Sequence, residues 1–287
     1  MSAAREPNLP RRPLPVGPAV AAVLAASLIA LFVLPLVALF WDAGASGLVA
    51  AAGNAAFRTS VEFTLLASGL AVGLGLLTGV PLGYLLARHR FPGRAIVESV
   101  VLVPVVIPHL VVGLALVLLL APNAPLGAVV AHAGIRIFDA TAGVVLVMMY
   151  VGASYVVLSS QLAFRSVDEE VLEAARSLGA TPTEAFLSVS LPAAARGIVT
   201  GALLMWARGV SEVGGFLVLA YAIYPGFPWS GPVTNTASVF IFNFYGISRS
   251  ATIGFAAVLV LVSLAIFLAV RAVDRTGLAW LRGGSVP

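Results

Sequence analysis

The chain of 287 residues contains no cysteine, and only 10% of its residues are charged. Without cysteine, the chain can form neither a disulfide framework nor a thiolate metal site. The charged share is far below the roughly 25% that is typical of soluble globular domains. These two absences exclude a disulfide-stapled secreted domain and argue against a water-soluble enzyme.

Lysine is also absent, so all 16 basic residues are arginine, and the formal net charge is +4. A positive charge of this size could suggest a nucleic-acid partner. However, the arginines flank apolar runs and do not cluster into a patch, which is a pattern that sets membrane topology. We therefore expect no nucleic acid among the partners.

Apolar residues make up 60% of the chain, and its mean hydropathy is +1.06. The first apolar run, 18–40, is longer than the ~7–15 residues of a signal-peptide core, and it can cross a hydrocarbon layer of about 30 Å. Backbone groups in lipid must bond internally, so the spans are predicted to be helices. The sequence predicts an all-α integral membrane protein with six transmembrane helices, over 18–40, 63–87, 99–120, 142–164, 197–221 and 251–270.

The arginines predict the orientation of these spans. With the N-terminus inside the cell, twelve arginines fall in cytoplasmic segments and three, Arg58, Arg136 and Arg249, fall outside. This bias predicts that both termini are cytoplasmic. We divide the chain into a disordered cytoplasmic tail (1–15), a six-helix membrane domain (16–273) and a cytoplasmic C-terminal tail (274–287).

The longest charged stretch between two apolar blocks is 165–197, which this topology places in the cytoplasm. Ser166 and Glu169 have the spacing of a capping box, so a helix is predicted to start at Val167 and to end before Gly179. Thr181 and Glu184 repeat the device, and a second helix of about two turns is predicted to end near Ser190. Such short helices normally need a partner surface.

The 165–197 loop resembles the EAA loop of ABC-importer permeases, E-A-A-x3-G-x9-I-x-L-P, with Val189 at the usual Ile position. The resemblance implies a type I ABC-importer permease fold, in which the short second helix docks on a cytoplasmic ATPase subunit. On local sequence alone, an ordinary solvated loop remains an alternative. The residues expected to couple to the ATPase are Glu173, Ala174, Ala175, Gly179, Thr181, Glu184, Phe186, Leu191 and Pro192.

Arg208 and Glu212 lie four residues apart in the fifth predicted span. Charges at this depth cost a few kcal/mol each on insertion scales, and they face a partner or a water-filled cavity. Their spacing predicts an ion pair on one helical face. The pair could lock the span into the bundle, or it could line a gate together with Ser211.

The stretch from Arg208 to Gly215 resembles A-R-x-x-[SG]-E-F-G-A in permeases of the molybdate, tungstate and sulfate importer group, with Val213 replacing Phe. In the third span, Pro104 to Gly113 is similar to the P-x3-P-P-x-V-x-G segment of that group, and His109 stands where many members carry a second Pro. A lone His in an apolar span is most often a packing residue, and a contact with an anion is the alternative. The candidate path or gate residues are Pro104, Pro108, His109, Arg208, Ser211 and Glu212.

No nucleophile–base constellation or phosphate-binding glycine loop is present, so we expect no catalysis, no metal and no cofactor in this chain. The resemblance instead implies ATP and Mg on two cytoplasmic ABC ATPase subunits, an extracytoplasmic oxyanion-binding protein and a second copy of the chain in a homodimer. The leading interpretation is the permease subunit of a molybdate or tungstate importer in the cell membrane. Sulfate is the nearest alternative, followed by a self-contained secondary transporter or channel and by an intramembrane enzyme.

The segment 225–248 has no close match in this resemblance. Its first part, 225–232, is rich in Pro, Gly and aromatic residues, and it is predicted to be an irregular external loop. The following uncharged aromatic stretch is predicted to be an interfacial or re-entrant helix. Its simplest interpretation is a connector that lies along the membrane.

Overall fold

The computed structural model describes residues 17–282, with side chains described for residue 17 and for 20–272. The expected N-terminal tail, 1–15, and the last residues, 283–287, lie outside this range. Within it the chain is helical, and its extended pairing is limited to two isolated β-bridges, Ile223 with Thr234 and Gly226 with Trp229. The prediction of an all-α fold is therefore confirmed.

The helices follow one another along the chain as α1 (Pro18–Gly53), α2 (Ala55–Arg88), α3 (Arg94–Val106), α4 (His109–Leu120), α5 (Pro125–His132), α6 (Thr141–Arg165), α7 (Glu169–Ser177), α8 (Pro182–Ala185), a π-helical turn (Phe186–Ser190), α9 (Leu191–Val210), α10 (Gly214–Leu219), α11 (Ala237–Tyr245) and α12 (Arg249–Arg282). Five helical stretches in the described chain are long and apolar enough to cross a membrane. The bent pair α3 and α4 passes the same test when the two helices are taken together, which gives a sixth span if they cross as one.

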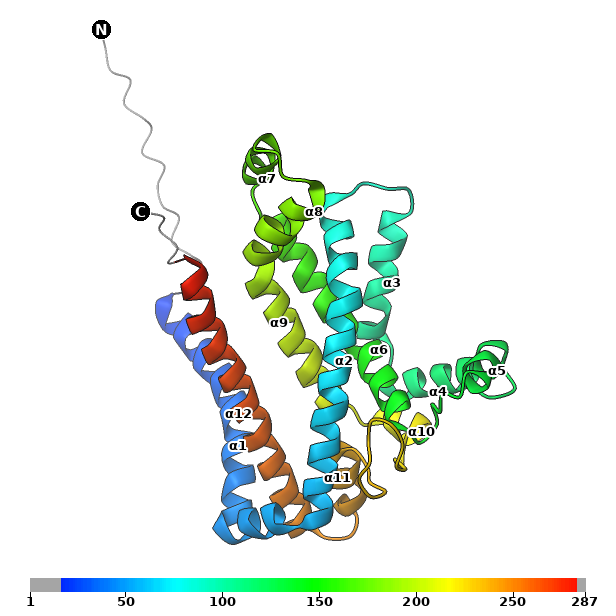
Figure 1. Cartoon of the computed structure of the whole chain (residues 1–287). Coiled ribbons are helices and arrows are strands. Elements are labelled where there is room, and N and C mark those ends of the chain that lie inside the picture. The colour runs from blue at the N-terminus through cyan, green and yellow to red at the C-terminus, as the bar shows by residue number, and fades with distance from the viewer. Residues whose placement is uncertain (1–16, 283–287) are drawn as a thin grey trace.

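The third span was expected as one run over 99–120, and this expectation is wrong, because α3 and α4 meet at an angle of 116°. Ile107 precedes a proline and is extended, with φ −70° and ψ 134°, and Pro108 has no N–H to continue the helical hydrogen bonds. As a result α4 turns away from the bundle axis, and with α5 it forms an arm at the side of the molecule (Figure 1).

Three other expected boundaries also need correction. Helix α1 continues beyond residue 40 to Gly53 and bends at Gly44, whose φ of 56° and ψ of 175° suit a residue without a Cβ. The fifth span ends at Val210, before α10, and does not run on to residue 221. Helix α12 continues to Arg282, so the segment expected as a tail from 274 begins inside a helix.

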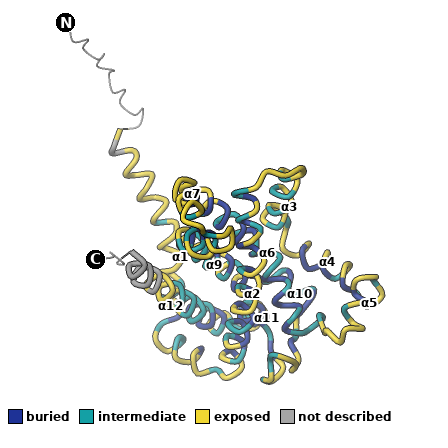
Figure 2. Tube along the Cα trace, turned by 45° about the horizontal axis from the view of Figure 1, so that its top comes forward, coloured by how far each residue is buried: buried dark blue, intermediate teal, exposed yellow. Residues whose placement is uncertain are grey.

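The centre of the bundle is formed by α2, α6 and α9, with α6 in its interior (Figures 1 and 2). Glycine allows these helices to approach closely. A Cβ on Gly83 of α2 would lie 2.9 Å from the carbonyl oxygen of Val157 in α6, and a Cβ on Gly201 of α9 would lie 3.0 Å from that of Tyr155. In lipid there is no hydrophobic driving force between helices, so their association depends on van der Waals packing. Small residues at the helix contacts allow this close packing.

Helices α1 and α12 lie side by side next to this centre (Figures 1 and 2). They join it near one end through an aromatic cluster, in which the ring of Phe57 lies 5.6 Å from Phe240 and 4.7 Å from Phe255. Phe240 belongs to α11, so the predicted aromatic helix after residue 234 is confirmed as a helix, and it packs against the bundle.

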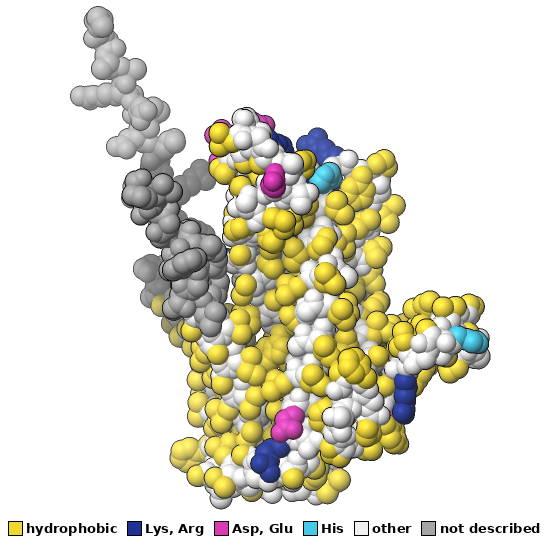
Figure 3. Space-filling view, in the orientation of Figure 1, with side chains coloured by type: hydrophobic (Ala, Val, Ile, Leu, Met, Phe, Trp, Pro, Cys, Tyr) yellow, Lys and Arg dark blue, Asp and Glu magenta, His cyan; other side chains and the backbone are white. Residues whose placement is uncertain are grey.

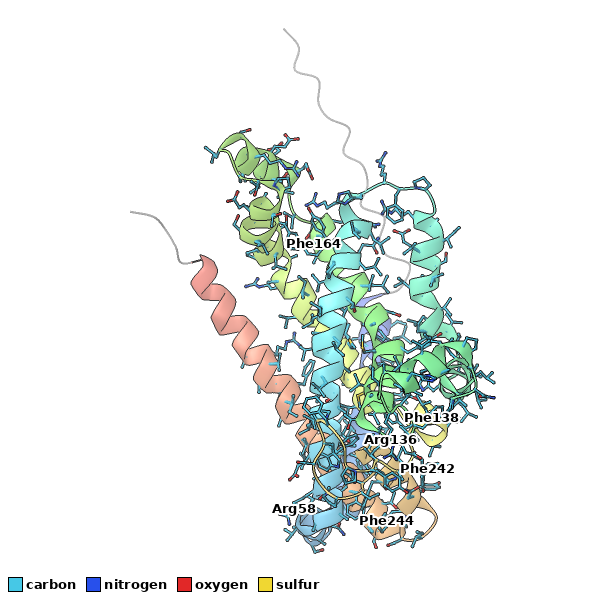
Figure 4. The ribbon with its side chains drawn as sticks, turned by 45° about the vertical axis from the view of Figure 1, so that its right-hand side comes forward. Arg58, Arg136, Phe138, Phe164, Phe242 and Phe244 are labelled. Carbon is cyan, nitrogen blue, oxygen red and sulfur yellow. The ribbon has the colours of Figure 1, made fainter. Side chains whose placement is uncertain are left out.

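The two ends of the bundle carry most of its visible charge. In Figure 3 the side of the molecule is largely apolar, and charged side chains gather at the end that carries α7. Arg58 and Arg136 lie toward the opposite end from Phe164 (Figure 4). This arrangement agrees with the separation of inner and outer arginines that the sequence predicts.

Candidate functional site

Two groups of residues singled out by the sequence form separate sites at different depths of the bundle. The first is the 165–197 loop at the end where α7 and α8 lie (Figure 1). The second is formed by His109, Arg208 and Glu212, which we call the Arg208 triad.

The start of α7 differs from the prediction. Its cap is Asp168, whose carboxylate accepts from the Glu170 N–H at 3.1 Å, and the helix begins at Glu169. Ser166 instead ends α6, with its hydroxyl donating to the Ala163 carbonyl oxygen at 2.8 Å. Asp is as good a cap as Ser, and the hydroxyl is already used by the preceding helix, so the cap lies two residues later than expected.

The end of α7 is confirmed at Gly179, which has a φ of 96°. The N–H of Gly179 donates to the Arg176 carbonyl oxygen at 2.9 Å, and the N–H of Ala180 donates to that of Ala175 at 3.1 Å. This pair of bonds is the Schellman motif, which requires a left-handed residue at the position of Gly179. This turn connects the end of α7 to the start of α8.

The capping box at the start of α8 is confirmed as well. The Glu184 N–H donates to the Thr181 hydroxyl oxygen at 3.3 Å, and the Glu184 carboxylate accepts from the Thr181 N–H at 2.7 Å. Pro182 occupies the first turn, where no N–H is needed. These side chains are exposed, so the box orders the start of α8 at the surface.

The expected end of this second helix near Ser190 is wrong. The chain passes from α8 through the π-helical turn 186–190 into α9, and Pro182–Val210 is one continuous helical stretch. Pro192 cannot donate to a carbonyl four residues earlier, and the wider turn before it, in which the Leu191 N–H bonds to the Phe186 carbonyl oxygen, accommodates this missing donor. The loop is therefore connected to the fifth span by a continuous helix.

Phe186 fixes this continuous helix to the rest of the bundle. Its ring lies 4.7 Å from that of Tyr84 in α2 and 5.9 Å from that of Phe164 in α6, and Tyr84 and Phe164 are themselves 5.1 Å apart. The remaining coupling candidates differ in exposure: Glu173, Ala174, Gly179, Thr181 and Glu184 are exposed, whereas Ala175, Leu191 and Pro192 are partly buried.

Sequence reasoning missed three residues of this loop region. Leu178 and Leu187 remain 90% and 55% exposed, which gives the loop an apolar surface. Arg88, at the end of α2, contacts the Glu169 carboxylate and the Val167 carbonyl oxygen. The two leucines could have been noticed in the sequence, since apolar residues in a polar cytoplasmic loop are unusual. The Arg88 contact joins residues about eighty positions apart, and no local sequence pattern indicates it.

The Arg208 triad joins residues from the broken third span and from the end of the fifth. Arg208 Nη2 donates to Glu212 Oε2 at 2.8 Å and also contacts His109 Nε2. His109 Nδ1 lies 3.3 Å from the same Glu212 oxygen. A ring nitrogen that accepts from arginine carries no hydrogen, so we assign the ring hydrogen to Nδ1.

The predicted ion pair is confirmed, but its backbone differs from the expected helical face. Helix α9 ends at Val210, and Glu212 lies after it, on the turn that leads into α10. Its side chain is completely buried, and Oε1 accepts from the Gly215 N–H at 2.8 Å. The Ser238 hydroxyl donates to the Glu212 backbone carbonyl oxygen, so this residue joins α9, α10 and α11.

The other path candidates lie near the triad or apart from it. Pro108 is the cap of α4, directly before His109. Ser211 donates to the Arg208 carbonyl oxygen at 3.0 Å and makes no hydrogen bond with the triad side chains among the described residues. Pro104 lines a separate cavity of about 260 Å³ between α2, α3 and α6. No three His, Asp or Glu side chains in the described chain are close enough to share a metal ion.

Comparison with known proteins gives consistent results. Residues 79–276 match the family model described as "Binding-protein-dependent transport system inner membrane component". The molybdate/tungstate transport system permease protein WtpB of Pyrococcus furiosus is 39% identical over 215 residues, which cover 74% of this chain and 76% of that protein. The sulfate transport system permease protein CysT of Synechocystis is 32% identical over 256 residues, covering 87% and 86%.

Solved structures show the same fold. A chain of a bacterial alginate ABC transporter, in complex with its alginate-bound periplasmic protein, aligns with a TM-score of 0.68 and 19% identity, covering 89% of this chain and 93% of that one. A chain of the MetNI methionine ABC transporter, in an inward-facing conformation, aligns with a TM-score of 0.56 and 19% identity, covering 77% and 94%. At these identities the likeness is one of fold.

Proposed function

Because the chain belongs to the family of binding-protein-dependent transport system inner membrane components, we propose that it is the subunit through which an ABC importer moves molybdate or tungstate across the membrane. The chain is a multi-pass membrane protein with the type I importer permease fold, and it is a permease subunit and not itself an enzyme. The energy of transport accordingly comes from a separate ATPase subunit.

The identity of 39% with permeases named for molybdate and tungstate carries the choice of substrate. It is higher than the 30% and 32% identity with the two sulfate permeases of Synechocystis, which nevertheless cover more of the chain. Sulfate is therefore the second candidate. Molybdate, tungstate and sulfate are all tetrahedral dianions, so the same hydroxyls, backbone amides and arginine could pass any of them.

We propose that the 165–197 loop is the contact with the ATPase. The loop is held firmly on its inner side by Phe186 and Arg88, and it presents Leu178 and Leu187 outward. An apolar surface on a polar loop is a feature of protein interfaces. The exposed part of the EAA motif, Glu173 and Ala174, lies on the same loop and is proposed to take part in this contact.

The complex that follows from this role has several members. We propose a homodimer of this chain, two ATPase subunits that carry ATP and Mg, and an external binding protein that delivers the oxyanion. Two-fold symmetry is the common closure for such a pair. We also propose that α7 and α8 face the cytoplasm, because the arginine-rich segments are at that end.

The test is uptake in cells that lack other oxyanion importers, with the chain co-expressed with its ATPase and binding protein. The proposal predicts accumulation of labelled molybdate or tungstate that depends on all three proteins. Accumulation of sulfate without the other two would support the second candidate. Accumulation of none of the three would contradict the oxyanion assignment.

A further inference from the structure

A cavity of about 650 Å³ lies between α2, the start of α6 and the loops that precede α6 and follow α10. Its walls are mostly apolar, with Leu70 and Leu74 from α2 and Val145 and Met149 from α6. Leu70 and Leu74 are exposed, so the cavity is open at the surface of the molecule. Arg136 is the only charged residue among those that line it. Such walls suit an apolar ligand with one anionic group, and not a small dianion.

The depth of this cavity in the membrane follows from the length of α6. This helix has 25 residues and ends at Arg165, at the end of the bundle that carries α7. At 1.5 Å per residue it is about 37 Å long, whereas the hydrocarbon layer is about 30 Å thick. The first turn of α6, with Thr141 and Ala142, therefore reaches the opposite headgroup region. Met149 lies about two turns deeper, so the cavity extends from headgroup level into the acyl layer.

Arg136 supplies a cation without a counter-ion at the headgroup end of the cavity. Its Cζ lies 5.1 Å from the centroid of the Tyr224 ring. Within the described chain this is its only polar or ring contact, and no carboxylate pairs with it. A ring over the face of a guanidinium leaves the N–H groups available, because these point outward in the guanidinium plane. Paired N–H donors of arginine bind phosphate in a bidentate way.

Asp139 holds the two loops of the cavity together. Its carboxylate accepts from the Ala222 N–H at 3.2 Å, and its backbone carbonyl oxygen accepts from the Tyr224 N–H at 3.1 Å. Its own N–H donates to the Leu219 carbonyl oxygen at 3.3 Å. These three bonds fix the loop that carries Tyr224 against the loop that carries Arg136. The walls are therefore formed without a ligand, which lowers the cost of binding.

We propose that this cavity binds an anionic phospholipid from the leaflet on the side away from α7 and α8. The headgroup phosphate lies on Arg136, and one acyl chain lies along Leu74 and Met149. Lipid chains are as apolar as these walls, so the chain gives little preference for one lipid over another. Selectivity comes from Arg136, because a zwitterionic headgroup brings its own cation and an anionic one does not. This site goes beyond the proposed transport and does not depend on the imported ion.

The test counts the phospholipids that the purified complex of permease and ATPase retains in detergent, by mass spectrometry of the intact complex. Dioleoyl phosphatidylglycerol and dioleoyl phosphatidylcholine, which share their chains, are added separately. The wild type is expected to prefer the anionic lipid about fivefold, the effect of one basic residue at an anionic membrane surface. Arg136→Gln should abolish this preference, and Arg136→Lys should keep most of it, since an ammonium also binds phosphate.

The matched control is Arg58→Gln. Arg58 is also exposed, lies toward the same end of the bundle and does not line the cavity (Figure 4). This variant is expected to keep the wild-type preference. An equal loss in Arg58→Gln and Arg136→Gln would mean that general surface charge attracts the lipid, and it would overturn the proposal.

A second variant tests the place of the acyl chain. Ala142→Phe puts a ring into the cavity and leaves Arg136 in place, so the retention of both lipids is expected to fall while the ATPase still assembles. Unchanged retention in Ala142→Phe would overturn the proposal. So would loss of permease dimers in this variant and in Arg136→Gln without a change in bound lipid, since the cavity would then be a contact between copies. If Ala142→Phe does not assemble, the comparison of Arg136→Gln with Arg58→Gln decides.

Discussion

Arg88, the last residue of α2, donates a hydrogen bond from Nη2 to the backbone carbonyl oxygen of Val167 at 2.6 Å. Its Nη1 contacts the carboxylate of Glu169, at the start of α7. The Arg88 side chain is only 15% exposed, whereas that of Glu169 is 53% exposed. The bond to the carbonyl is therefore the better shielded of the two, and it ties the second span to the 165–197 loop.

Arg88→Ala is expected to lower substrate imported per ATP several-fold, because the loop would lose its tie to α2 while the spans keep their packing. Arg88→Lys should retain part of the import per ATP that Arg88→Ala loses, since an ammonium can reach either the Glu169 carboxylate or the Val167 carbonyl oxygen. Arg90→Ala is the control, because Arg90 is exposed, lies two residues away and makes no hydrogen bond or ion pair in the described range. Equal coupling ratios for Arg88→Ala and Arg90→Ala would contradict the proposed tie.

Gly179→Val is expected to disturb the turn between α7 and α8. A Cβ at Gly179 would meet no atom within 4 Å, so the penalty comes from its φ of 96° and not from a clash. That penalty is about 1–2 kcal/mol for an ordinary residue and larger for a β-branched one. ATP hydrolysis stimulated by the loaded binding protein should fall, and Gly179→Asn should be milder because Asn tolerates the left-handed region.

The control for this prediction is Gly69→Val. A Cβ at Gly69 would also meet no atom within 4 Å, but this residue lies within α2 with an ordinary helical backbone. Unchanged assembly and unchanged stimulated hydrolysis in Gly179→Val would show that the turn does not position the ATPase contact.

Local signals in the sequence predicted much of this loop, and distant contacts explain where prediction failed. The capping box at Thr181 and the glycine turn at Gly179 depend on residues within five positions, so spacing alone located them. The continuous helix through Pro192 could not be foreseen, because proline usually marks a helix start, and a π-helical turn leaves no pattern of its own.

The same distinction holds for the Arg208 triad. The pair Arg208 and Glu212 follows from their spacing and from the cost of isolated charge in lipid, and the structure confirms it. The contact with His109 crosses 99 residues and depends on the bend at Pro108. The sequence predicted one unbroken span over 99–120, and neither the break at Pro108 nor the direction and neighbour of α4 was derived from it.

Phe186→Ala is expected to destabilise the permease by about 1–3 kcal/mol, since it removes ring contacts with Tyr84 and Phe164. Leu187→Ala changes the next residue, which points a 55% exposed side chain outward. It should leave the melting temperature of the isolated permease near wild type but weaken co-purification of the ATPase. If Leu187→Ala lowered the melting temperature and Phe186→Ala weakened only the co-purification of the ATPase, the assignment of an inner and an outer face to this helix would be wrong.

Neutralising either Arg208 or Glu212 alone is expected to destabilise the permease by on the order of 3–5 kcal/mol, because one uncompensated charge would remain in the bundle. Removing both should cost less than the sum of the single changes. Thermal unfolding of Arg208→Gln, Glu212→Gln and the double variant gives the coupling energy. Strict additivity would mean that the two residues stabilise the protein independently, in spite of the 2.8 Å contact.

The central claim, that this chain is the membrane path of a molybdate or tungstate importer, is tested most directly by competition in proteoliposomes. The chain is reconstituted with its ATPase, ATP is enclosed on the ATPase side, and the binding protein is added outside with labelled tungstate. We expect saturable, ATP-dependent accumulation that excess unlabelled molybdate suppresses and excess sulfate leaves largely unchanged. Accumulation that sulfate suppresses and molybdate does not, or no accumulation with all partners present, would contradict the claim.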